Sequence, residues 1–136
     1  MIKKISIHTD GGARGNPGPS AVGVVISDQD GRIIKKIGQV IGIKTNNQAE
    51  YEALILALTE AKALAAEQVE CFLDSELVVK QVQGLYKVRE EGLKPLASKV
   101  LSLTASFSQI SFKHVPREKN QLADKLVNEA LDKSGF

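Results

Sequence analysis

Four carboxylates stand where a strand is expected to end or a helix to begin. Asp10 and Asp74 each close an alternating apolar pattern, while Glu50 and Asp124 fall in the first turns of two expected helices. If these ends converge, the charges repel one another and need cations nearby. Oxygen-only ligands select hard cations, which predicts Mg²⁺, with Mn²⁺ as the alternative. Two such ions about 3.5–4 Å apart stabilise both the attacking and the leaving oxygen of a phosphodiester displacement, and this is the chemistry predicted.

Each carboxylate also has an ordinary structural explanation. Asp10 precedes Gly11, and Asp-Gly is a common turn dipeptide. Asp74 is placed to cap the helix that follows it, and an acidic side chain such as Glu50 is favourable at any helix N-terminus. That last explanation does not account for the direction of Glu50, which lies on the same stripe as the apolar residues of its helix. A carboxylate facing inward is costly unless something positive meets it.

The elements that position these residues follow from hydrophobic periodicity and turn signals. Strands are expected at 5–10, 21–26, 32–41, 69–74 and 110–115, and helices at 47–63, 75–82, 94–106 and 120–133. The first two hairpins are short, and Thr45 with Gln48 forms a capping box before the first helix. This order predicts an α/β fold: a mixed five-stranded sheet, with three antiparallel strands followed by parallel strands, and helices packed on it.

Composition limits the class of protein. A chain of 136 residues, 43% hydrophobic and 25% charged, suits one domain over residues 1–136, and we expect a monomer. No apolar stretch reaches the roughly 18 residues that span a bilayer, and the N-terminus has no signal-peptide pattern. The lone Cys71 is expected to be a buried thiol in a reducing cytoplasm. A net charge of +2 and a 4% aromatic content predict at most a local basic patch and little base stacking.

Five segments together resemble ribonuclease H of type 1. They are Thr-Asp-Gly-Gly at 9–12, Asn-Pro-Gly at 16–18, Thr-Asn-Asn-Gln-Ala-Glu at 45–50, Leu-Asp-Ser at 73–75 and Asn-Gln-Leu-Ala-Asp at 120–124. The resemblance covers essentially the whole chain in order and spacing. It implies an endoribonuclease that hydrolyses the RNA strand of RNA–DNA hybrids, leaving 5′-phosphate and 3′-hydroxyl ends. Double-stranded RNA is a further candidate substrate.

The resemblance also implies roles for individual residues. The catalytic, metal-binding acids would be Asp10, Glu50, Asp74 and Asp124, with Asp10 and Asp74 holding two metal ions most directly. Glu50 would serve the 2′-hydroxyl side and Asp124 the side of the attacking water. The substrate-binding residues would be Gly11, Asn16, Thr45, Asn46, Asn47, Ser75 and Arg117. Among these, Thr45 matches a position that holds a DNA phosphate.

Three features depart from the family pattern. Arg117 stands about where many members have a histidine, and an arginine contacts phosphate but is a poor proton shuttle. Glu76 replaces a glutamine that often follows the Asp-Ser pair. The segment 83–93 is short and lacks a basic, tryptophan-containing protrusion, for which Lys87, Arg89 and Lys94 are a partial substitute. The chain therefore resembles the compact archaeal-type and bacterial variants.

Two other functions remain open at this point. The first is a non-catalytic module that binds hybrids or double-stranded RNA, although clustered negative charge beside phosphates would not help binding alone. The second is an enzyme that acts on a small sugar phosphate with the same acid cluster. Paired asparagines and a glycine-rich loop favour a polymer over a small ligand.

Overall fold

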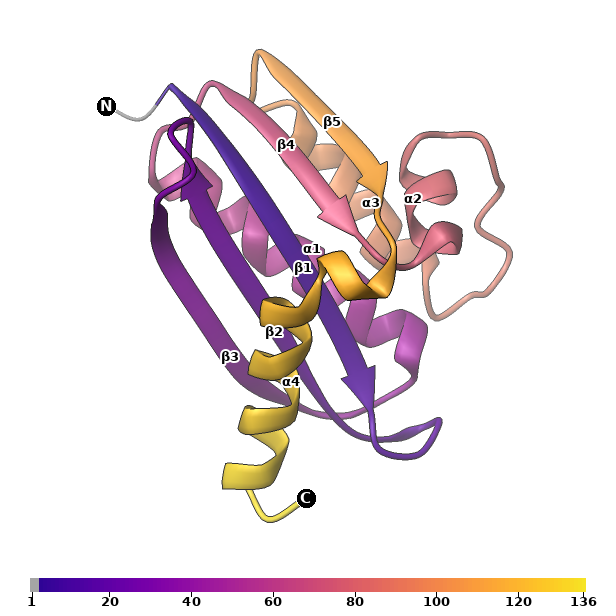
Figure 1. Ribbon diagram of the computed structural model, residues 1–136. Coiled ribbons are helices and arrows are strands. Elements are labelled where there is room, and N and C mark those ends of the chain that lie inside the picture. Colours follow the sequence, from indigo (N-terminus) through magenta and orange to yellow (C-terminus); the bar gives the residue numbers. More distant parts are fainter. Residues whose placement is uncertain (1–2) are drawn as a thin grey trace.

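The computed structural model describes residues 3–136, which form one mixed sheet with helices on both faces (Figure 1). The strands are β1 (Lys4–Ala13), β2 (Gly18–Asp28), β3 (Ile33–Lys44), β4 (Gln68–Leu73) and β5 (Gln109–His114). The helices are α1 (Asn46–Ala63), α2 (Glu76–Val82), α3 (Lys94–Thr104), the short 3-10 helix η1 (Arg117–Lys119) and α4 (Gln121–Lys133). The predicted order of strands and helices is confirmed.

The sheet has the strand order β3-β2-β1-β4-β5. β1 pairs antiparallel with β2, and β2 with β3, whereas β1 with β4 and β4 with β5 are parallel pairs. This confirms the predicted α/β architecture. One face of the sheet carries α1 and α3, and α4 crosses the other face over β1, β2 and β3 (Figure 1). Among the residues that the structure describes, no helix covers the amino-terminal halves of β1, β4 and β5 on the α4 side.

The main core lies between α1 and the sheet, because the apolar stripe of α1 faces the inward residues of β1 and β2. Ile5, Ile7, Leu54 and Leu58 are fully buried there. Burying each such side chain contributes roughly 1.5–3 kcal/mol. Cys71 lies in the same core, where burial raises the pKa of its thiol, as expected for an inert cysteine. Within residues 3–136, no helix is both long and apolar enough to cross a membrane.

The first strand differs from the prediction, because β1 does not end at Asp10. Residues 10–13 continue the strand by pairing with 20–23 of β2, so the glycines are extended rather than looped. Only the parallel pairing stops here: its last pair is Thr9 with Leu73. Asp10 and Asp74 therefore each follow the last parallel pair of two neighbouring strands.

Candidate active site

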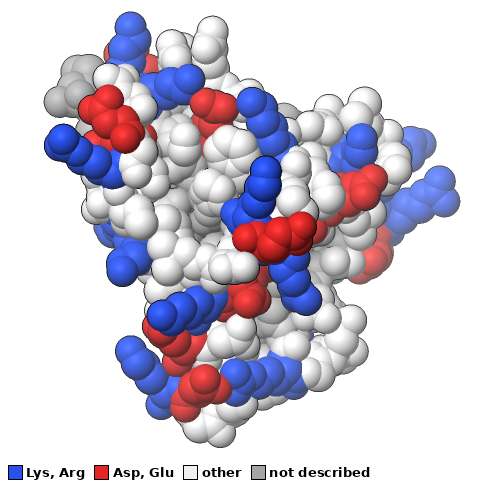
Figure 2. Space-filling view, in the orientation of Figure 1, with Lys and Arg blue, Asp and Glu red and all other residues white. Residues whose placement is uncertain are grey.

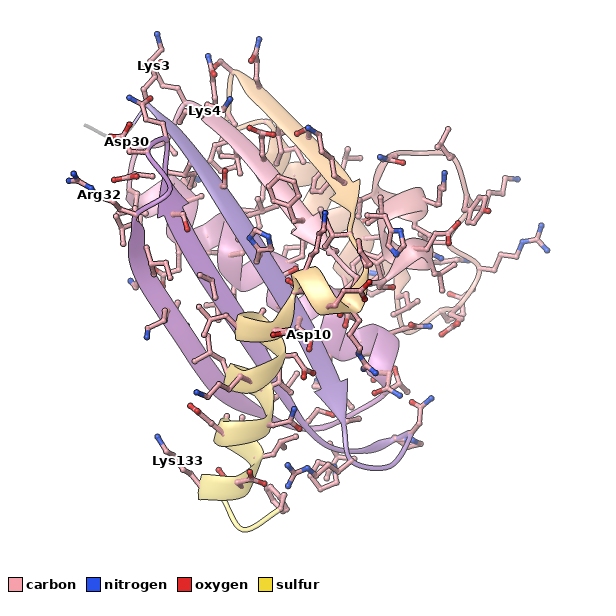
Figure 3. The ribbon with its side chains drawn as sticks, in the orientation of Figure 1. Lys3, Lys4, Asp10, Asp30, Arg32 and Lys133 are labelled. Atoms are coloured by element: carbon pink, nitrogen blue, oxygen red, sulfur yellow. The ribbon has the colours of Figure 1, made fainter. Side chains whose placement is uncertain are left out.

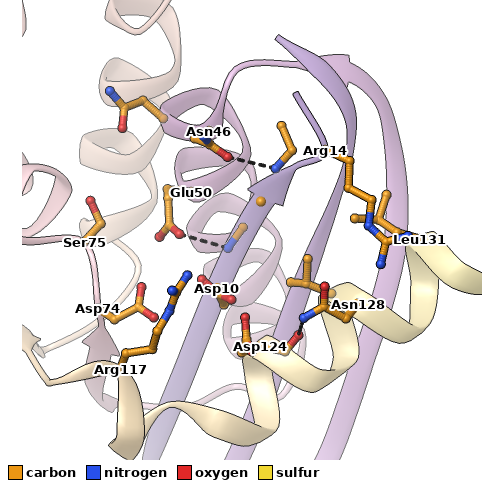
Figure 4. Close-up of a pocket in the computed structure, with 15 residues that line it drawn as sticks. Asp10, Arg14, Asn46, Glu50, Asp74, Ser75, Arg117, Asp124, Asn128 and Leu131 are labelled. Carbon is orange, nitrogen blue, oxygen red and sulfur yellow. Dashed lines mark hydrogen bonds between the residues drawn. The ribbon is translucent and has the colours of Figure 1, made fainter. Parts of the chain in front are cut away.

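Three of the four predicted acids meet at this edge of the sheet. Asp10, Glu50 and Asp74 each place one carboxylate oxygen within 4.8 Å of the others. Asp124 lines the same open cavity, of about 410 Å³, from the first turn of α4 (Figure 4). Asp10 lies within β1 and Asp74 follows the end of β4, while Glu50 comes from near the start of α1 and Asp124 from the first turn of α4.

The N-terminus of α1 is tied directly to β1 and its hairpin, which places Glu50. The N–H of Gly11 donates to Oε1 of Glu50 at 3.1 Å. The N–H of Ala13 donates to Oδ1 of Asn46 at 2.9 Å, and the N–H of Asn46 donates to Oδ1 of Asn16 at 3.0 Å. These bonds hold the first turn of α1 against the strand that carries Asp10.

Asn120 places Asp124 in a comparable way. Its side chain is 1% exposed, and Nδ2 donates a 2.8 Å hydrogen bond to the carbonyl of Thr9, the residue before Asp10. The N–H of Asp124 donates to the carbonyl of Asn120 at 3.1 Å. The start of α4 is therefore anchored to β1 beside the acids. The sequence showed Asn120 only as part of a motif, because nothing local to it indicates a partner 111 residues away.

The capping explanation for Asp74 is wrong. Ser75 is the N-cap of α2, and its Oγ accepts a 3.3 Å hydrogen bond from the N–H of Val78. Within residues 3–136, Oδ2 of Asp74 and Oε2 of Glu50 are buried without a hydrogen-bond partner. Buried polar atoms without partners are rare because their desolvation is uncompensated. A hard cation would satisfy these oxygens, so the donor set fits Mg²⁺ or Mn²⁺.

The electrostatics of the cluster favour a cation beside these acids. Burial raises the pKa of Asp10 to about 7; the negative charges of Asp74 and Asp124 act in the same direction, and a contact with Glu50 partly opposes them. Burial, followed by the charge of Asp10, raises the pKa of Glu50 well above its usual range, against the bond from Gly11. Without a cation the pair therefore retains protons in a pH range where isolated carboxylates are ionised.

The predicted substrate residues lie in or beside this cavity. Gly11, Asn46, Asn47, Ser75 and Arg117 line it together with the acids (Figure 4). Asn16 is exposed on the β1–β2 hairpin and joins the site through Asn46. Thr45 forms the predicted capping box, in which its Oγ1 accepts from the N–H of Gln48 at 3.1 Å and its N–H donates to Oε1 of Gln48 at 2.9 Å.

Gly11 has a structural reason that sequence alone did not reveal. A Cβ at this position would lie 2.2 Å from the carbonyl carbon and oxygen of Ala49 in α1. The glycine is needed because the backbones of β1 and α1 touch, not because a ligand must pass there. The expectation of an open glycine loop beside Asp10 is therefore corrected: the strand continues through Gly11 and Gly12.

Two further polar residues line the cavity without having been predicted. Arg14 extends from the β1–β2 hairpin, and its guanidinium pairs with Asp132 at 2.7 Å and donates to the carbonyl of Phe136. Asn128 lies one turn after Asp124, and its Nδ2 donates to the Asp124 carbonyl at 3.1 Å. A basic residue among glycines, and a polar residue four positions after a site acid, were the available signals.

Known proteins are similar to this chain over almost its whole length. A family model described as reverse transcriptase-like matches residues 8–130. Ribonuclease HI of Halobacterium salinarum is 43% identical over 129 residues, which are 95% of this chain and 65% of that protein. A bifunctional protein of Mycobacterium tuberculosis is 41% identical over 130 residues, 95% of this chain but 36% of that protein. The chain thus spans less than two thirds of these curated relatives.

Solved structures match the fold closely. RNase H1 from the halophilic archaeon Halobacterium salinarum superposes with a TM-score of 0.93 at 43% identity, covering 96% of this chain and 98% of that one. LC11-RNase H1, isolated from compost by a metagenomic approach and solved in complex with an RNA/DNA hybrid, gives a TM-score of 0.92 at 47% identity, covering 97% and 99%.

Proposed function

The chain belongs to the type 1 ribonuclease H family, and from this premise we propose that it hydrolyses the RNA strand of RNA–DNA hybrids, leaving 5′-phosphate and 3′-hydroxyl ends. The observation that carries the proposal is the group of three carboxylate oxygens within 4.8 Å of one another, at the floor of an open cavity. The hybrid held by LC11-RNase H1 supports the class of substrate.

We propose that Asp10, Glu50, Asp74 and Asp124 hold two divalent cations, Mg²⁺ with Mn²⁺ as the alternative. The partnerless oxygens of Glu50 and Asp74 support this assignment. When bound, such ions lower the pKa of a water and offset the negative charge on the scissile phosphate. The acids would also orient that phosphate. Hydrogen bonds from Gly11 and Asn120 hold α1 and α4, which carry Glu50 and Asp124, against β1.

The neighbouring polar residues are proposed to bind the nucleic acid. Arg117 is exposed at the edge of the acid cavity and remains charged at every relevant pH, which suits a phosphate contact. The hydroxyls of Thr45 and Ser75 accept hydrogen bonds from backbone N–H groups, so their own protons are free to donate to phosphate oxygens. Asn16, Asn46 and Asn47 are proposed to contact nucleotides. Gly11 has no side chain and its N–H is engaged with Glu50, so a substrate contact at this residue would use its other backbone atoms.

The test is cleavage of an RNA–DNA hybrid labelled on the RNA strand, with Mg²⁺, with Mn²⁺ and with a chelator. Cleavage should require the cation and should be lost in Asp10→Asn, and the RNA fragments should carry 3′-hydroxyl ends. Double-stranded RNA and double-stranded DNA, assayed in parallel, define the substrate range. Tight hybrid binding without cleavage under any condition would contradict the proposal and indicate a non-catalytic binding module instead.

We further propose that residues 1–136 act as a single ribonuclease H domain, as a monomer and in the cytoplasm. The buried, unreactive thiol of Cys71 supports a reducing compartment. Light scattering during size-exclusion chromatography measures the oligomeric state directly: a mass near 14.7 kDa is expected, and a mass twice as large would contradict the monomer.

A further inference from the structure

A second cavity lies on the sheet face that α4 only partly covers. It has a volume of about 280 Å³ and is bounded by β1, β2, the turn into β3 and the start of α4. Its lining includes His8, Val25, Ser27, Ile33, Lys119 and Leu122. Figure 2 shows this side of the molecule, where an uncharged area over the strands is bordered by charged side chains.

His8, which lines this cavity, is one ring of a stacked aromatic pair. The imidazole of His8 stacks on Phe72 of β4, with ring centroids 4.9 Å apart and an interplanar angle of 21°. Because β1 lies between β4 and β2, the imidazole face turned away from Phe72 points toward β2. The cavity residues Val25 and Ser27 belong to β2, and Val25 is the register partner of His8, so this face of the imidazole lies on the cavity side of the ring.

Positive charge lies beside Phe72 of the stacked pair and at the cavity wall. The ammonium of Lys113 lies 6.0 Å from the centroid of the Phe72 ring. Glu70 pairs with both Lys4, at 3.1 Å, and Lys113, at 3.2 Å, so one carboxylate is shared by two cations. Lys119 is exposed and contributes to the cavity wall itself. A planar ring in the cavity would extend the stack, and an anionic group attached to it would meet positive charge.

The cavity lies directly beside the candidate active site. His8 and Asp10 are two residues apart on the same face of β1, a spacing of about 6.6–7 Å along a strand. The short η1 separates the two cavities: Arg117, at its start, lines the acid cavity, and Lys119, at its end, lines this one. Figure 3 labels Lys4, at the start of β1, and Asp10, which lies further along the same strand.

We propose that this cavity binds one base of a single-stranded segment that adjoins the duplex, stacked on His8 with its phosphate beside Lys119. A nucleotide combines a planar heterocycle with an anion, which is the chemistry that the ring face and the lysines share. Stacking tolerates any base, so the site would read the presence of an unpaired base rather than its identity. The identification of the polymer rests on the proposed function, whereas the site itself is defined by its geometry.

The test compares a blunt RNA–DNA hybrid with hybrids that carry a short single-stranded overhang at either end, and with the same overhangs made abasic. Affinity is measured by fluorescence anisotropy in chelator, so that no cleavage occurs. An overhang with bases should bind several-fold more tightly than the blunt hybrid, and the abasic overhang should lose most of that gain. The gain should vanish in His8→Ala and persist in His8→Phe, which retains a ring face.

Lys119→Ala should reduce the overhang gain and its salt dependence, whereas Lys99→Ala, an equal change of charge on α3 at the other sheet face, should not. NMR titration of His8 in the unmodified protein, with uridine monophosphate against ribose 5-phosphate, tests the site without any duplex. Shifts of the imidazole signals with the nucleotide alone support the proposal. An overhang gain that is equal for abasic strands, or unchanged in His8→Ala, overturns it. Mg²⁺-dependent cleavage of the blunt hybrid, run in parallel, reports separately on the proposed function.

Discussion

The backbone N–H of Gly11 donates a 3.1 Å hydrogen bond to Glu50 across an interface that leaves no room for a side chain on the glycine. The nearest atoms to a Cβ there would be backbone atoms of Ala49, which cannot move without moving α1. Strand β1 carries Asp10 and helix α1 carries Glu50. The close approach of two backbones is therefore what brings these two carboxylates together.

Gly11→Ala should displace the start of α1, lowering stability by at least about 1–3 kcal/mol and weakening cation binding, because an overpacked contact must relax by backbone movement. Gly12→Ala is the matched control, since its Cβ would meet only Cγ1 of Val127, at 3.5 Å. Urea unfolding and calorimetric titration with Mg²⁺ measure the two effects. Equal stability of the two variants would show that the interface adapts without cost.

Asp74→Asn should abolish cleavage without lowering stability in the absence of metal. The amide cannot replace a charged ligand, and one of several mutually repelling carboxylates has gone. Ser75→Ala should instead lower stability by about 0.5–2 kcal/mol, because it removes the cap of α2, and it should weaken hybrid binding while the four acids remain. Melting curves with and without Mg²⁺, beside a cleavage assay, separate the roles. Full cleavage by Asp74→Asn would end the assignment of this residue as a metal ligand.

In the absence of metal, the contribution of the acid cluster to the free energy of unfolding should decrease as the pH rises from about 4 to about 7. The folded-state pKa of Asp10, about 7, is above its value of about 3.9 in an unfolded chain, and that of Glu50 is raised in the same direction. The folded state therefore binds more protons in this window and loses stability as they dissociate. Mg²⁺ prefers the ionised acids, so its stabilising effect should grow over the same range.

The measurement for this pH effect is the melting temperature in chelator across that range, for the wild type and for Asp10→Asn. The difference between the two proteins isolates the cluster from surface acids such as Glu70, whose pKa is lowered by hydrogen bonds from Lys4 and Lys113. Asp10→Asn should show the flatter decline. Parallel curves for the two proteins would argue against a raised pKa at Asp10.

Arg117→Ala should weaken hybrid binding while leaving the shape of the pH–rate profile intact, because an arginine holds phosphate but does not titrate near neutrality. Arg117→Lys should restore part of the affinity, since it keeps the charge and loses the bidentate fork. The assay is kcat and KM for hybrid cleavage between pH 5 and 9. A variant that binds normally but lacks one limb of the profile would contradict the phosphate-binding role.

The irregular segment between α2 and α3 should contribute to hybrid affinity through its positive charges. Lys87 and Arg89 are exposed there, and Lys94, the first residue of α3, pairs with Glu91 at the surface. Replacing all three by Ala should reduce the slope of log Kd against log salt by up to about three, roughly one for each phosphate contact. The control is Lys36, Lys62 and Lys133 replaced together, an equal change in net charge. Identical slopes for both triple variants would remove the segment from the footprint.

The element order was predictable from sequence because its signals are local, whereas the roles of the four acids stay a prediction, with three of them brought within 4.8 Å of one another. Alternating apolar residues, the Asp-Gly turn before β3 and the Thr45–Gln48 capping box each act within a few positions. The inward stripe of α1 indicated that Glu50 faces the core, and the structure buries it. Short connections between the first three strands similarly limited how the sheet could be arranged.

The contacts that build the site depend on segments far apart in the chain, and these were decided by tertiary packing. The continuation of β1 past Asp10 is due to pairing with β2, and α2 is capped by Ser75 rather than by Asp74. His8 and Phe72 are 64 positions apart, and only the parallel register of β1 and β4 stacks their rings. Periodicity specifies which face of a strand a residue occupies. The neighbour that the residue contacts on that face depends on sheet order and register. These are determined by the whole chain, because burial and backbone pairing involve segments far apart in sequence.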